Sequence, residues 1–213
     1  MNLADACDIE FWRSRYRSGR TPWDLGQVSD PVRTLVERWF PPAGRVYIPG
    51  CGRGYEALYL AERGYAVTAV DIAPEPIASL RQEARQRGLA LDIREGDLFA
   101  LSRQDEGAFD VFLEQTCLCA LPPRRQPDYA ALAYRALKPG GQVLAVLMRV
   151  PFADGPPFDL PPERLQTLFP APLWQREGPW PVEPPNPARP GPEYLARCVR
   201  LAGAPAREPG EYS

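Results

Sequence analysis

The sequence contains no histidine, and Lys138 is its only lysine. It therefore lacks the side chain that most often serves as a general base near neutral pH. Its five cysteines are an odd number with no histidine to complete a mixed metal site, so we expect neither a disulfide framework nor a bound metal. Any chemistry of this chain must proceed without a histidine base.

A basic excess and a long apolar run are missing as well. The 25 Lys and Arg residues face 27 Asp and Glu residues, a net charge of -2, which argues against a nucleic-acid partner. No apolar run approaches the roughly 20 residues that a membrane helix needs. The N-terminal residues Asp5, Asp8 and Glu10 do not fit a signal peptide. We expect a cytoplasmic protein without a membrane partner, and one domain over residues 1–213.

The stretch from Val46 to Tyr55 reads Val-Tyr-Ile-Pro-Gly-Cys-Gly-Arg-Gly-Tyr and predicts a strand, a tight turn and a helix start. Gly50, Gly52 and Gly54 can adopt positive φ angles and let the backbone approach a ligand. The free N–H groups of the first helical turn suit an anionic group. By itself, such a turn can equally be a simple connection between a strand and a helix.

A second apolar strand ends at Asp71, next to the glycine turn. A carboxylate there can accept both hydroxyls of a ribose, so the pattern indicates a nucleoside-containing ligand. A dinucleotide site would carry its third glycine at position 55, which is Tyr55 here. The pattern therefore favours S-adenosylmethionine (SAM) over NAD as the cofactor.

Strands and helices then alternate, which predicts a Rossmann-like, doubly wound α/β fold with a parallel sheet and a ligand at the carboxyl ends of its strands. Asp97 follows the third strand and either accepts from an adenine amino group or caps a turn. Gln115 ends the fourth strand. A frayed tail is expected over residues 202–213. The expected strands after Asp71 cover residues 89–94, 109–115, 142–150, 173–176 and 194–201, and the helices among them cover residues 74–87, 127–137 and 163–169.

Aromatic residues gather ahead of the sheet, with Trp12 and Tyr16 in an expected helix over residues 8–18 and Trp23 after it. Their composition favours simple packing on the domain. The alternative is a cap over the cofactor, because aromatic faces attract a sulfonium as they attract ammonium ions.

Two arginines, Arg124 and Arg125, follow the fourth strand, and Tyr129 lies in the next expected helix. A cation beside an acceptor thiol would raise its thiolate fraction, although both arginines also suit a solvated loop. Tyr129 either lines an acceptor pocket or packs in the core.

Several segments together resemble the thiopurine S-methyltransferase family, with its plant thiol and halide methyltransferase relatives, within the class I SAM-dependent methyltransferases. Pro-Gly-Cys-Gly, where many methyltransferases carry an acid before the first glycine, is the most discriminating. The matching segments are Phe11-Trp12 through Tyr16, Gly19 through Asp24, Pro49-Gly50-Cys51-Gly52, Asp71, Gly96-Asp97-Leu98-Phe99, Gln115 through Leu121 with Tyr129, and Gly155-Pro156-Pro157-Phe158.

The resemblance implies a seven-stranded, mostly parallel sheet whose last strand is antiparallel. It replaces the packing interpretation of the N-terminal aromatics, since residues 1–40 would form a helical cap over the cofactor. The residues that the resemblance places at the cofactor are Trp12, Tyr16, Trp23, Gly50, Asp71, Asp97, Leu98 and Gln115.

The expected function is methyl transfer from SAM to a small acceptor, a thiol sulfur before halides or selenium and tellurium species. SAM is an activated donor with a neutral leaving group, so the reaction needs orientation and desolvation more than acid–base help. A nicotinamide-dependent oxidoreductase and a SAM-binding protein without catalysis are the alternatives. The sequence does not fix the oligomeric state, and a monomer is compatible with it.

Overall fold

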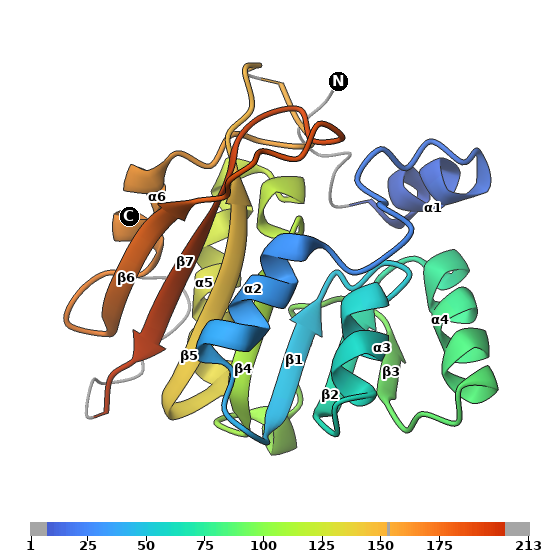
Figure 1. The fold of residues 1–213 in the computed structure, drawn as a ribbon, viewed down its shortest axis with the longest axis horizontal. Coiled ribbons are helices and arrows are strands. Elements are labelled where there is room, and N and C mark those ends of the chain that lie inside the picture. The colour runs from blue at the N-terminus through green and yellow to red at the C-terminus, as the bar shows by residue number, and fades with distance from the viewer. Residues whose placement is uncertain (1–7, 153, 203–213) are drawn as a thin grey trace.

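The computed structural model describes residues 8–152 and 154–202, and the predicted tail beyond Ala202 lies outside the described residues. Helices and strands alternate along the chain (Figure 1), with short 3-10 turns between some of them. In chain order the helices and strands are α1 (Ile9–Arg17), α2 (Asp30–Trp39), β1 (Arg45–Pro49), α3 (Tyr55–Ala61), β2 (Ala66–Asp71), α4 (Pro74–Gln86), β3 (Asp92–Glu95), β4 (Phe109–Gln115), α5 (Gln126–Ala136), β5 (Leu137–Met148), α6 (Pro162–Leu168), β6 (Trp174–Pro181) and β7 (Glu193–Arg200).

The strands form one seven-stranded sheet in the order β3-β2-β1-β4-β5-β7-β6. Neighbouring strands are parallel except that β7 runs antiparallel to both β5 and β6. The predicted fold class is therefore confirmed, including the antiparallel last strand. The strand order reverses between β1 and β4, and a ligand crevice is expected outside the carboxyl ends of the strands at such a point.

Helices cover both faces of the sheet because side chains alternate along each strand. On β1, Val46 and Ile48 pack into the core that α2, α3 and α4 share. Tyr47, between them, packs into the opposite core under α5 and α6, where its ring stacks on Phe112 with centroids 5.6 Å apart. The central strands are thus buried on both sides, as apolar parallel strands require.

The two N-terminal helices differ in how they attach. Ser29 caps α2 by accepting from the N–H of Val32, and the buried side chains of Val32 and Leu35 fix this helix on the sheet. Helix α1 has no buried residue and lies beyond the sheet, above α4 (Figure 1). Within the predicted cap of residues 1–40, α2 therefore packs into the core on one face of the sheet. Helix α1 contributes no buried residue to that core.

Three strand boundaries differ by three residues or more from the sequence-based expectation. Strand β5 begins at Leu137, which pairs with Phe109 on β4, rather than at residue 142. Strand β3 begins at Asp92 rather than at residue 89, because the N–H of Leu89 still closes the end of α4 on the carbonyl of Ala84. Strand β6 continues to Pro181 rather than ending at residue 176. Strand β6 is an edge strand, so its outer side pairs with no other strand of the sheet. A proline there removes no hydrogen bond between strands on that side.

Among the described residues, no helix combines the length and the apolar character needed to cross a membrane.

Replacing Gly54 by Ala should destabilise the fold. Gly54 has a φ of +72°, and an added Cβ would lie 2.5 Å from both terminal methyl carbons of the buried Leu80. Left-handed strain of about 1–2 kcal/mol and crowding of about 1–3 kcal/mol should together lower the free energy of unfolding in urea. Gly64→Ala is the matched control, since its φ is +84° but nothing lies within 4 Å of the added Cβ. Equal losses in both variants would show that Leu80 moves aside freely.

Candidate active site

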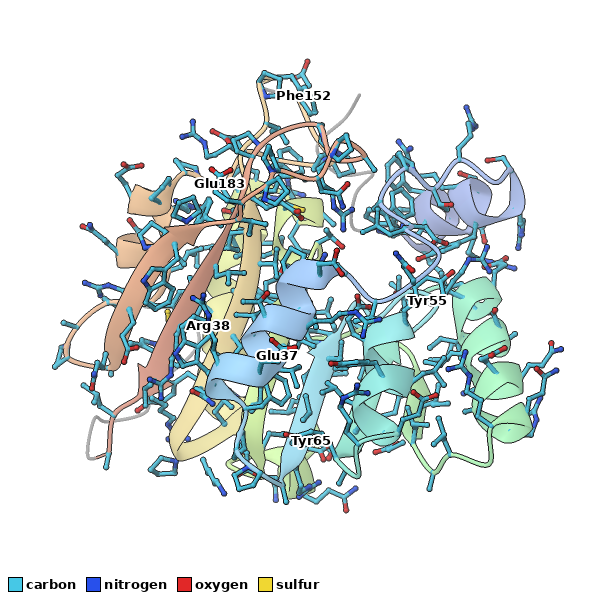
Figure 2. The ribbon with its side chains drawn as sticks, viewed as in Figure 1. Glu37, Arg38, Tyr55, Tyr65, Phe152 and Glu183 are labelled. Carbon is cyan, nitrogen blue, oxygen red and sulfur yellow. The ribbon has the colours of Figure 1, made fainter. Side chains whose placement is uncertain are left out.

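A cavity of about 550 Å³ lies at the carboxyl ends of β1, β2 and β4, where the topology places a ligand crevice. Its size is typical of sites for small molecules. The loops after β5 and before β7 reach the same upper edge of the sheet, next to α1 (Figure 1). Figure 2 shows Phe152 at the tip of the loop after β5; this cavity residue is 41% exposed.

The glycine turn after β1 forms one wall. Gly50 has a φ of +59°, and a Cβ at this residue would lie 2.5 Å from the Sγ of Cys117, so the turn after β4 presses directly on the glycine backbone. The N–H of Cys51 donates to the carbonyl of Val70, which joins this turn to the end of β2. Only glycine fits such a contact.

Asp71 holds the glycine turn from the side. Its Oδ2 accepts from the N–H of Gly52 at 2.8 Å, and its Oδ1 accepts from the N–H of Ala73 at 2.9 Å. Burial raises the pKa of this carboxyl, and the backbone donors lower it. A carboxylate offers about four lone-pair sites, so Asp71 keeps acceptor capacity for a ligand in the cavity that it lines.

Gln115 carries the clearest sign of a missing ligand. Both polar atoms of its side-chain amide are buried, and neither has a hydrogen-bond partner among the described residues. A buried amide without partners is unfavourable by about 1–3 kcal/mol per group. Because Gln115 lines the cavity, a ligand with a donor and an acceptor would satisfy it.

Thr116, the next residue, also lines the cavity and has a φ of +56°. A β-branched residue in this region is strained by about 1–3 kcal/mol, and such strain concentrates at functional sites. Sequence reasoning did not single out Thr116, because no local pattern shows that a threonine will adopt a left-handed conformation.

Three aromatic side chains form the wall opposite the sheet. The ring of Trp23 lies edge-on to Trp12 and Tyr16, with centroids 5.5 and 5.8 Å apart, and all three residues line the cavity. Composition alone favours packing on the domain, and the rings do contact one another, but all three also border the cavity. Their role at a cofactor, which the resemblance implied, stays a prediction.

Arg189 was missed by the sequence analysis. Its side chain is 3% exposed, forms an ion pair with Glu193 at 3.1 Å and donates to the backbone carbonyl of Trp23 at 2.8 Å. It lies in the Pro-rich segment between β6 and β7 and lines the cavity. This segment is therefore hydrogen-bonded to the backbone of the N-terminal aromatic residues. No periodicity in the sequence predicts that contact.

The predicted site residues separate into two groups. Gly54 packs against Leu80 and does not line the cavity. Tyr129 is fully buried, donates to Glu114 and does not line the cavity either. Arg124 is exposed and also lies outside the lining. The predicted residues that line the cavity are Trp12, Tyr16, Trp23, Gly50, Gly52, Asp71, Asp97, Leu98, Gln115 and Arg125.

Comparison with known proteins gives the family. The family model for thiopurine S-methyltransferase matches residues 7–177, most of the chain. The chain belongs to the thiopurine S-methyltransferase family. Its SAM-dependent methyltransferase activity and its cofactor, SAM, follow from that membership, which sets aside the oxidoreductase and the non-catalytic alternatives.

Individual relatives agree with this thiopurine S-methyltransferase assignment. Thiocyanate methyltransferase 1 of Brassica oleracea is 28% identical over 161 residues, 73% of this chain and 69% of that relative. Thiopurine S-methyltransferase of Legionella pneumophila is 27% identical over 175 residues, 75% of this chain and 79% of that relative. The 1,6-didemethyltoxoflavin-N1-methyltransferase of Burkholderia thailandensis, solved with S-adenosylhomocysteine, superposes with a TM-score of 0.73 at 22% identity, covering 93% of this chain and 88% of that one.

Replacing Asp71 by Ala should weaken binding of S-adenosylhomocysteine by about 1–3 kcal/mol, or about 5- to 150-fold in Kd, because ligand hydroxyls lose a charged acceptor. Isothermal titration calorimetry measures this loss. Asp92→Ala, on β3 and outside the cavity lining, is the control and should bind as the wild type does. Wild-type affinity in an Asp71→Ala protein with an unchanged melting temperature would exclude Asp71 from the site.

Proposed function

We propose that this enzyme transfers the methyl group of SAM to the sulfur of a small thiol. The observation that carries the proposal is the unpartnered amide of Gln115 in a cavity that also contains Asp71 and the glycine turn. The names of the relatives support a sulfur acceptor. The lack of histidine suits an acceptor that ionises near neutral pH without a strong base.

The residues around the cavity suit the parts of the cofactor. Asp71 would accept from the ribose hydroxyls. Asp97, whose Oδ1 already accepts from the N–H of Phe99 at 2.9 Å, would use its second oxygen for the adenine amino group beside Leu98. The amide of Gln115 and the backbone of Gly50 and Gly52 would hold the remaining polar groups. Trp12, Tyr16 and Trp23 would face the sulfonium, which their rings attract.

Arg125 is the cation that we assign to the acceptor. Its guanidinium lies 4.2 Å from the centre of the Phe99 ring and pairs at 3.1 Å with Asp128, whose side chain is 49% exposed. Arg189 also lines the cavity, but its side chain is 3% exposed and is held by the buried Glu193 and the carbonyl of Trp23. The ion pair of Arg125 with the half-exposed Asp128 is instead screened by water. A positive charge beside the acceptor stabilises its thiolate and so lowers the pKa of the thiol.

The protein's part in catalysis is orientation and exclusion of water. When bound, SAM supplies an activated methyl group with a neutral thioether as the leaving group. The aromatic wall and the loop containing Phe152 and Pro156 would hold a thiolate in line with that methyl group. Desolvation of the thiolate there makes its sulfur a stronger nucleophile.

The direct test is turnover with labelled SAM and a panel of small thiols, halides, catechols and amines. We expect methylated thiols as the main products. Catechols or amines that react faster than every thiol would contradict the sulfur acceptor while leaving methyl transfer intact.

Replacing Arg125 by Leu should move the rise of kcat with pH upward by about half a pH unit or more, because the bound acceptor thiolate loses a neighbouring cation and kcat reports the pKa values of the enzyme–substrate complex. The pH profile for one thiol measures the shift. Arg124→Leu is the matched control, since Arg124 lies outside the cavity lining. Superimposable profiles for wild type and Arg125→Leu would make Arg125 a loop residue without a role at the acceptor.

We further propose that the protein is a single cytoplasmic domain without a nucleic-acid partner, and a monomer is compatible with the structure. The four described cysteines are unpaired and buried, which suits a reducing compartment. The cap over the cofactor would consist of α1 and the segment up to Gln27, because α2 packs on the sheet.

A further inference from the structure

Glu114 is a buried carboxylate that the proposed function does not use. It precedes Gln115 on β4, and its side chain is 1% exposed. Because side chains alternate along a strand, Glu114 points to the α5 side, beneath the cavity wall. Its Oε1 accepts from the N–H groups of Cys117 and Leu118 at 3.0 and 2.8 Å, and its Oε2 accepts from the hydroxyl of the fully buried Tyr129.

These bonds fix the turn that follows β4. Thr116, inside the turn, has the strained left-handed backbone, and Cys117 presses on Gly50. Gln115 presents its unpartnered amide to the cavity from the start of the same turn. One carboxylate therefore holds the segment that carries the amide and that supports the glycine turn.

The three groups that face Glu114 directly stay uncharged near neutral pH. They are Tyr129 from α5 and the thiols of Cys117 and Cys119, with Asp71 facing Cys117 from the end of β2. Burial raises the pKa of all three uncharged neighbours, so they stay neutral. Burial also raises the pKa of Glu114 to about 7, although the bonds from Tyr129, Leu118 and Cys117 lower it.

The two protonation states of Glu114 hold the turn differently. The carboxylate accepts from all three donors, and such charge-assisted bonds are about twice as strong as neutral ones. Once protonated, the carboxyl must donate its own hydrogen. Tyr129 can accept it by turning its hydroxyl hydrogen to Cys117, its other side-chain partner. The two backbone N–H groups then keep only a neutral acceptor.

We propose that Glu114, supported by Tyr129, is a positioning residue that fixes the turn from Gln115 to Leu118 for cofactor binding and thereby couples that binding to the release of a proton. The inference rests on the cavity being the SAM site. By linkage, a ligand that favours the ordered turn favours the carboxylate, and the carboxylate in turn favours the ligand.

The test is calorimetric titration with S-adenosylhomocysteine, which has no group that titrates near pH 7. Titrations at pH 6, 7 and 8, each in two buffers with different ionisation enthalpies, give Kd and the number of protons released. We expect the wild-type Kd to fall by about threefold or more from pH 6 to pH 8, with proton release near pH 7. In Glu114→Gln, the Kd at pH 8 should rise by about tenfold and become independent of pH. Binding to this variant should release no proton from position 114.

Two controls separate this role from general damage. Asp105→Asn changes a side chain that is also 1% exposed but lies outside the cavity lining, and Tyr134→Phe changes another tyrosine of α5. Both should keep the wild-type pH profile. Tyr129→Phe removes a bond that lowers the pKa of Glu114, so the proton release should move to higher pH; this variant serves if Glu114→Gln does not fold.

Thermal unfolding gives an independent sign. The folded pKa of Glu114 lies above its unfolded value, so the stability that its protonated form contributes is present below about pH 4.5 and is lost as pH rises through about 7. The melting temperature of the wild type should therefore fall relative to that of Glu114→Gln between pH 5 and pH 8.

Distinct outcomes overturn distinct claims. Wild-type Kd and proton release in Glu114→Gln would exclude the positioning role. If Glu114→Gln lowered kcat but kept the wild-type Kd and proton release, Glu114 would lie on the path of the acceptor's proton. That result would also overturn the positioning role. No binding of S-adenosylhomocysteine by the wild type would contradict the cofactor site itself, whereas wild-type binding without proton release would contradict only the coupling.

Discussion

The hydrogen bond from the N–H of Gly52 to the carboxylate of Asp71 is the contact on which the architecture of the site depends. It joins the turn after β1 to the end of β2, two segments that are otherwise irregular at this edge of the sheet. Because the same carboxylate also accepts from Ala73, it orders both turns with one charge. The orientation of the Asp71 carboxylate that orders the two turns thus also presents its remaining acceptor lone pairs to a ligand.

The central part of the fold could be predicted because its signals are local. The strand, glycine turn and helix around Gly50 follow from about ten consecutive residues, and β4 was predicted with the bounds that the structure shows. Asp71 could be assigned because an acid at the end of the second strand has a fixed relation to the first turn. In each case the residues that decide the structure are neighbours in sequence or stand at a topologically fixed distance.

The remainder of the site depends on contacts that no local pattern encodes. Arg189 reaches the carbonyl of Trp23, 166 residues earlier in the chain. The left-handed backbone of Thr116 has no local signal in the sequence. Tyr129 lies on the apolar face of α5, and the sequence does not show whether such a face contacts a cavity or the core. In the structure, Tyr129 contacts Phe112 and Glu114. The same ambiguity applies to Trp12, which borders the cavity.

The antiparallel strand β7 has a consequence for the order in which the enzyme becomes competent. The glycine turn and Asp71 come from the first third of the sequence, whereas the segment with Arg189 is held at the cavity by Glu193, the first residue of β7. Since β7 lies between β5 and β6, the segment that carries Arg189 can take its place at the cavity only after the last strand has joined the sheet, so the wall that it forms depends on the edge of the sheet farthest along the chain.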